Sequence, residues 1–146
     1  MKKTLYIASD HAGIEAKAEL CAFLGDAGWD VHDLGPGAED GRVDYPDYAE
    51  RVARRVLDED CRGVLLCGTG IGMSIAANKV HGTRAALVHS EETAALAGEH
   101  NNANILVAGA RVHSTEEIKT FLSAWLTAEF EERHQMRLDK LHALER

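Results

Sequence analysis

Five short apolar runs alternate along this chain with segments of helical periodicity, and this order limits the possible folds more than any other feature. The run at 64–66 has no polar alternation, as expected of a strand buried on both faces of a parallel sheet, and the runs at 4–8 and 84–88 are likewise expected to be buried strands; the other two strands cover residues 29–34 and 105–108. We therefore expect one α/β domain over residues 1–146, a doubly wound five-stranded parallel sheet of the Rossmann-like or flavodoxin-like αβα type with a C-terminal helix.

Start and stop signals divide the intervening segments into helices. Ser90 and Ser114 are followed by acidic residues and read as caps, and Gly28 stands where a helix ends. The expected helices cover residues 14–27, 46–59, 73–78, 90–98, a segment that follows the cap at 114, and a last helix that begins near Thr127.

The stretch from Val64 to Asn78 concentrates the chemical signals. Cys67 ends a buried strand, residues 68–72 read Gly-Thr-Gly-Ile-Gly, and good helix formers resume at Met73. The first N–H groups of such a helix have no intrahelical partner and suit an oxyanion or a phosphate. The positive end of the helix also favours thiolate over thiol at Cys67. The alternative is that Cys67 is only a small buried apolar residue and that the glycines let the turn close.

Two better-known glycine loops do not fit this stretch. The dinucleotide fingerprint requires glycine at the position of Met73, and the P-loop requires Gly-Lys-Ser/Thr, whereas Lys79 lies between Asn78 and Val80. The sequence therefore predicts a thiol directly before an anion-binding turn, without either nucleotide motif.

Further polar residues lie next to the predicted strands. Ligands bind at the carboxyl ends of the strands in such sheets, and we expect a site there that contains Asp10, His11, Cys67 to Gly72, His100, Asn101 and Arg111. A purely structural interpretation is also open, because Asp10 suits a helix cap and His100 and Asn101 suit a turn.

Arg133 and Arg137 lie four residues apart, on one face of the expected last helix. Two adjacent guanidinium groups suit a phosphate clamp. The alternative is a surface helix on which Arg133 pairs with Glu129.

Composition argues against several functions. The net charge of −8 and a pI near 5.4 disfavour nucleic-acid or membrane-surface binding, and we expect neither a signal peptide nor a membrane-spanning segment. Three irregularly spaced cysteines indicate a reducing cytoplasm rather than a disulfide framework. The histidines follow no metal-binding spacing, so we expect no metal.

Taken together, the motifs resemble the type B ribose-5-phosphate isomerases and their relatives that isomerise galactose 6-phosphate and allose 6-phosphate. The resemblance covers essentially the whole chain. It rests on Ser9-Asp10-His11-Ala12-Gly13, Asp44-Tyr45-Pro46, Cys67-Gly68-Thr69-Gly70-Ile71-Gly72, Ile75-Ala76-Ala77-Asn78-Lys79, His100-Asn101, Gly109-Ala110-Arg111 and Arg133-His134-Gln135-Met136-Arg137.

This resemblance implies an isomerase of the non-oxidative pentose phosphate pathway that interconverts ribose 5-phosphate and ribulose 5-phosphate through an enediolate, without metal or cofactor. It implies catalytic roles for Cys67 as the base, His100 as the proton donor that opens the furanose ring, and Thr69. The implied substrate-binding residues are Asp10, His11, Tyr45, Gly68, Thr69, Gly70, Ile71, Gly72, Asn101, Arg111, Arg133 and Arg137. Some family members carry a glutamate base just after the loop, where this chain has Met73.

The resemblance further implies a homodimer or homotetramer whose arginines reach the neighbouring site. Apolar residues near the carboxyl end fit either such an interface or packing within the chain; they are Trp125, Phe130, Leu138, Leu141 and Leu144. Two other functions stay open: the same chemistry on a six-carbon sugar phosphate, and a non-catalytic sensor of sugar phosphates. The sensor leaves Cys67 and His100 without a task.

Overall fold

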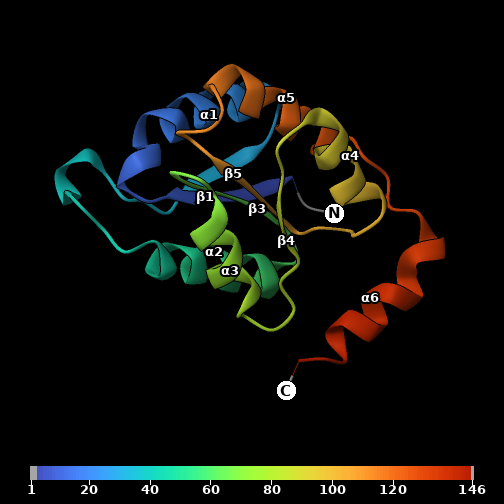
Figure 1. Ribbon diagram of the computed structural model, residues 1–146. Coiled ribbons are helices and arrows are strands. Elements are labelled where there is room, and N and C mark those ends of the chain that lie inside the picture. The colour runs from blue at the N-terminus through green and yellow to red at the C-terminus, as the bar shows by residue number, and fades with distance from the viewer. Residues whose placement is uncertain (1–2, 146) are drawn as a thin grey trace.

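A single parallel sheet with helices on both faces forms the centre of the computed structural model, which describes residues 3–145 (Figure 1). Its strands run in the order β2-β1-β3-β5-β4, with every neighbouring pair parallel. They are β1 (Thr4–Ser9), β2 (Asp30–Asp33), β3 (Arg62–Cys67), β4 (Ala85–Leu87) and β5 (Ile105–Gly109). The predicted doubly wound α/β fold is confirmed.

The helices form two layers. They are α1 (Ile14–Asp26), α2 (Tyr45–Glu59), α3 (Ile71–Asn78), α4 (Glu91–Glu99), α5 (Thr115–Leu126) and α6 (Gln135–His142). Figure 1 shows α1, α4 and α5 over one face of the sheet and α2 with α3 over the other, while α6 extends away from the body. Strand residues alternate between these layers, so that Leu5 and Ile7 pack in one core and Tyr6 and Ala8 in the other.

The chain winds away from β1 in both directions, which makes the gap between β1 and β3 the topological switch point of the sheet. Asp10 follows β1 directly and Cys67 ends β3. The Asp10 N–H donates to the Leu66 carbonyl oxygen at 3.0 Å, which ties the two strand ends together. Asp10 and Cys67 therefore lie at the switch point, the place where such folds bind ligands.

The prediction of a buried strand at residues 84–88 is wrong, because β4, like β2, lies at an edge of the sheet. Both are edge strands, and neither contains a fully buried residue. An edge strand has a neighbour on one side only, so its residues can be apolar, as in β4, without being enclosed. The other three strands are buried over almost their whole length.

The predicted helix start near Thr127 is also wrong. Thr127 ends α5, and its hydroxyl donates to the Ser123 carbonyl oxygen at 2.7 Å. An irregular segment follows, then a 3-10 turn at Glu132–His134 that leads into α6. The expected caps at Ser90 and Ser114 are confirmed, since each side chain accepts a hydrogen bond from the N–H three residues on.

None of the helices in residues 3–145 combines the length and the apolar character that crossing a membrane requires.

Candidate active site

The Cys67 thiol lies at the carboxyl end of β3 and is 5% exposed. The N–H of Gly70 donates to its Sγ at 3.1 Å. Gly70 has φ +84°, and a Cβ at this position would lie 3.1 Å from the Ala108 carbonyl carbon and 3.2 Å from the Gly109 nitrogen. Only glycine combines this backbone conformation with so close an approach to β5, so the glycine aims an N–H at the sulfur.

The turn after Cys67 presents further N–H groups. The Ile71 N–H donates to Thr69 Oγ1 at 3.2 Å, and the first helical hydrogen bond runs from Ser74 N–H to the Gly70 carbonyl at 3.0 Å. The N–H groups of Gly72 and Met73 belong to the first turn of α3, where no intrahelical acceptor exists. The helix begins at Ile71, earlier than predicted, and its positive end faces the turn beside the thiol.

Three predicted substrate-binding residues lie at the same edge of the sheet: Asp10 and Tyr45, expected to line the sugar, and His11, expected to bind the phosphate. Asp10 caps the 3-10 turn that precedes α1, because its Oδ1 accepts the Ala12 N–H at 2.9 Å. His11 Nδ1 accepts the Val43 N–H at 3.3 Å, so in the neutral ring Nε2 carries the proton. The Tyr45 ring lies against Gly72, where a Cβ would come within 2.6 Å of its Cζ.

The buried ammonium group of Lys17 holds the loop that leads to Tyr45. It donates to the Pro36 carbonyl oxygen and to Asp33 Oδ1, each at 2.7 Å, with only 3% of the side chain exposed. The loop between β2 and α2 is therefore fixed at the carboxyl edge of the sheet.

Arg111 supplies a cation to the same edge. The backbone N–H of Arg111 donates to the Gly68 carbonyl oxygen at 2.9 Å. Its side chain runs along Gly68, where a Cβ would lie 3.4 Å from Arg111 Nη1. Asp10, His11, Tyr45, the loop at 67–72 and Arg111 thus meet at one edge, as predicted. We call this group the thiol cluster.

His100 and Asn101 do not join the thiol cluster, so the prediction that they share the carboxyl edge is wrong. His100 caps the end of α4, and Asn104, before β5, donates its N–H to the Arg84 carbonyl just ahead of β4. Residues that precede a strand lie at its amino end. The six-residue strand β3 separates the two edges by about 16 Å at roughly 3.3 Å per residue.

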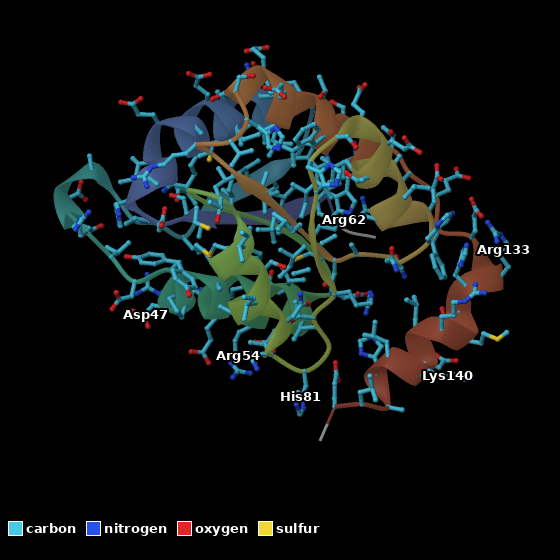
Figure 2. The ribbon with its side chains drawn as sticks, in the orientation of Figure 1. Asp47, Arg54, Arg62, His81, Arg133 and Lys140 are labelled. Carbon is cyan, nitrogen blue, oxygen red and sulfur yellow. The ribbon has the colours of Figure 1, made fainter. Side chains whose placement is uncertain are left out.

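The two arginines also lie on the far side. Figure 2 shows Arg133 beside α6, on the side opposite Asp47 in the first turn of α2. Arg133 pairs with Glu131 at 2.8 Å and not with Glu129, because it belongs to the 3-10 turn rather than to a helix that begins at Thr127. Arg137 lies in α6 and donates from Nη1 to His134 Nδ1 at 3.1 Å.

The residues that surround His100 in the structure were not predicted from the sequence. The His100 ring packs against the ring of His134 with centroids 4.3 Å apart. A ring nitrogen of each histidine and a carboxylate oxygen of Glu131 all lie within 4.8 Å of one another. We call His100, Asn101, Glu131, Arg133, His134 and Arg137 the histidine cluster. No local motif signals this contact, because it joins segments far apart in the chain.

The histidine cluster suits an anion better than a cation. Arginine can only donate, so His134 Nδ1 accepts from Arg137 and the neutral ring carries its proton on Nε2, leaving no lone pair there for a metal. Burial lowers the pKa of His134, and the charge of Arg133 lowers it further. Arg133 and Arg137 place two guanidinium groups beside the neutral ring, an arrangement that is chemically suited to a phosphate.

A cavity of about 620 Å³ lies next to the histidine cluster, between α6 and the connection from α3 to β4. Asn101 lines it together with Arg84, Leu138, Leu141 and Leu144. Cys67 is not among its lining residues, so this hollow and the thiol are separate features of one chain.

The fold and the thiol cluster define an α/β enzyme whose thiol stands beside a glycine-rich loop at the start of a helix. The sequence model of the ribose/galactose isomerase family matches residues 5–141, and the chain belongs to that family.

Relatives cover almost the whole chain. A probable ribose-5-phosphate isomerase B of Mycoplasma genitalium is 46% identical over 97% of this chain and 95% of its own length, and ribose-5-phosphate isomerase B of Escherichia coli is 42% identical over 99% and 97%. The crystal structure of ribose-5-phosphate isomerase B from Mycoplasma genitalium with bound ribulose-5-phosphate has a TM-score of 0.93, at 43% identity over 97% of this chain and 95% of that chain.

Proposed function

We propose that this protein is an aldose-ketose isomerase that interconverts ribose 5-phosphate and ribulose 5-phosphate, the reaction of the non-oxidative pentose phosphate pathway, in the cytoplasm. The observation that carries the proposal is the Cys67 thiol at the switch point of the sheet, 3.1 Å from the Gly70 nitrogen and beside free helix N–H groups. The relative crystallised with ribulose-5-phosphate supports the choice of a five-carbon substrate.

The thiol cluster accounts for the proton transfer. Cys67 as thiolate removes the C2 proton of the open-chain aldose, so that a C1–C2 double bond forms and the electrons of the C1 carbonyl move to O1. The proton of the C2 hydroxyl passes to O1, and Cys67 returns its proton to C1 as the C2 carbonyl of the ketose forms. Thr69 shapes the turn through its hydroxyl, and the loop from Gly68 to Gly72 directs N–H groups toward the developing oxyanion. Asp10 and Tyr45 line the sugar, and His11 and Arg111 contribute to binding the phosphate.

The histidine cluster accounts for ring opening. His100 gives a proton to the ring oxygen O4 as the C1–O4 bond breaks, and the C1 hydroxyl loses its proton to water as the aldehyde forms. Asn101 binds sugar oxygens, while Arg133 and Arg137 hold the phosphate. His100 and Asn101 lie at the amino edge of the sheet, about 16 Å, the length of β3, from the edge that carries Cys67 in the same chain.

A second copy of the chain can bring the two clusters together, although they lie apart within one chain. We propose a homodimer, or a homotetramer built from such dimers, in which the histidine cluster of one copy meets the thiol cluster of the other. Each dimer then contains two complete sites related by symmetry.

Exposed apolar side chains support this assembly. Ile71 and Ile75 on α3 are 54% and 58% exposed, and Leu141 and Leu144, which line the cavity, are 44% and 74% exposed. Trp125 and Leu138, by contrast, are buried within the chain. A face that leaves α3 and the carboxyl end uncovered is typical of an interface between subunits.

The test is formation of ribulose 5-phosphate from ribose 5-phosphate by the wild type, Cys67→Ala and Cys21→Ala, with EDTA present throughout. We expect full activity in the wild type and in Cys21→Ala, whose thiol lies on α1, and a loss of about a hundredfold or more in Cys67→Ala, as for removal of a general base. A wild type that turns over allose 6-phosphate but not ribose 5-phosphate would contradict the substrate. Tight binding without turnover would indicate a sensor.

A further inference from the structure

His134 has no part in the chemistry proposed above, yet it is built tightly into the histidine cluster. It is 8% exposed, and its ring packs on His100 at 4.3 Å between centroids, with 35° between the ring planes. Such a contact restricts the orientations that the His100 imidazole can adopt.

The tautomer of the neutral His134 ring is also set by its surroundings. Arg137 donates to Nδ1 at 3.1 Å, which leaves the proton of the neutral ring on Nε2. This Nε2 is buried and has no hydrogen-bond partner among residues 3–145. The nearest carboxylate oxygen is Glu131 Oε1 at 3.8 Å, and that atom already accepts hydrogen bonds from Arg133.

Main-chain contacts hold His134 against His100. The Glu131 N–H donates to the Glu99 carbonyl oxygen at 2.9 Å, and the His134 N–H donates to the Glu131 carbonyl oxygen at 3.0 Å. Gly98 permits this approach, because a Cβ there would lie 2.6 Å from the Cβ of Ala128. The segment after α5 is thus seated on the end of α4, next to His100.

We propose that His134 is a positioning residue for the ring-opening step: its ring, held by Arg137, orients the His100 imidazole toward the sugar ring oxygen. This inference rests on the proposed function. It also links the phosphate to ring opening, since Arg137 holds both His134 and, in the proposed site, the phosphate.

The charge of the pair favours the same role. His100 must carry a proton in order to donate one to O4, and a second imidazolium in contact with it would oppose that protonation. Burial first, and then Arg133, His100 and Arg137, lower the pKa of His134, while Glu131 raises it. A neutral His134 can therefore stack on a protonated His100 without adding repulsion.

Two assays separate ring opening from proton transfer. Isomerisation of ribose 5-phosphate requires both steps, because this aldose is mainly a closed ring. Exchange of solvent deuterium into C1 of ribulose 5-phosphate requires only Cys67 and the loop, because this ketose is an open chain.

For His134→Ala we expect isomerisation to fall about tenfold or more, as for a misoriented catalytic group, with exchange within about twofold of the wild type. His100→Ala should give the same pattern. His134→Phe keeps a ring against His100 and should regain most of the isomerisation. The matched control is His32→Ala, which removes a histidine ring stacked on Tyr6 at 5.1 Å in β2 and should change neither assay.

Equal losses in both assays for His134→Ala and His134→Phe would overturn the proposal, because they would indicate a general structural role. No loss in either assay would overturn it as well. A wild type that gives neither isomerisation nor exchange would refute the proposed function, and the inference with it. The wild-type measurement thus distinguishes a failure of the proposed function from a failure of the inference about His134.

Discussion

Replacing Gly70 by alanine should damage the protein both in stability and in catalysis. The glycine has φ +84°, and this left-handed conformation costs an L-residue about 1–2 kcal/mol. The new Cβ would lie 2.5 Å from Leu87 Cδ1, which is the end of a partly exposed side chain and can move. It would also lie 3.1 Å and 3.2 Å from backbone atoms of Ala108 and Gly109, which are held in the sheet.

These contacts set the size of the effect. Overpacking against a rigid neighbour costs about 1–3 kcal/mol. Reduced freedom of the unfolded chain returns about 0.4–1 kcal/mol. We therefore expect Gly70→Ala to lower the free energy of unfolding by about 2–4 kcal/mol, measured by urea denaturation at equilibrium. Isomerase activity should fall with it, because the Gly70 N–H can no longer point at Cys67 Sγ.

Gly25→Ala is the matched control for this substitution. Gly25 lies in α1, and its added Cβ would meet nothing within 4 Å. The change should stabilise the protein by up to about 1 kcal/mol through helix propensity. If Gly70→Ala proved as stable and as active as the wild type, the described geometry of the loop would be wrong.

Two further predictions concern stability. Lys17→Met should lower the free energy of unfolding by about 2 kcal/mol, because it leaves the Pro36 carbonyl without its charged donor. Arg54→Met, which breaks the exposed ion pair with Glu50, should have no measurable effect in the same urea experiment, and equal values for the two variants would contradict this account. The pKa of His134 is lowered from 6.5 on folding, so the unfolded chain binds its proton first and stability should fall as pH drops below about 6.5. The melting temperature of His134→Phe should therefore depend less on pH between about 7 and 5 than that of the wild type, and parallel curves would refute the assignment.

Features encoded by neighbouring residues were predictable. The strand and helix order, the caps at Ser90 and Ser114 and the turn after Cys67 each depend on a few consecutive residues, so local patterns were sufficient. The thiol cluster followed because residues after parallel strands meet at one edge.

Features that depend on the direction and the neighbours of an element were harder to predict. His100 stands at the end of α4, which returns from the carboxyl end of β4 to the amino edge of the sheet, just before β5. The order of strands and helices implies this position, but the closeness of His100 to β5 in the sequence suggested the carboxyl edge. The contact between His100 and His134 joins distant segments, and no local pattern encodes it. The start of α6 at Gln135 was missed because charged and apolar residues continue through residues 127–134, where the chain forms an irregular segment and a 3-10 turn instead of a helix.

The proposed site, assembled from two copies of the chain, can be tested by mixing two inactive variants. Cys67→Ala removes the thiol cluster's base and His100→Ala removes the histidine cluster's acid, so a mixed dimer contains one site with both defects and one intact site. Random pairing of equal amounts after joint refolding should restore about a quarter of wild-type turnover of ribose 5-phosphate. Cys67→Ala mixed with Arg111→Ala places both defects on the same edge, so no mixed dimer contains an intact site and the mixture should gain no activity over its separate components. If the first mixture stayed as inactive as its components, the site would not be shared between copies.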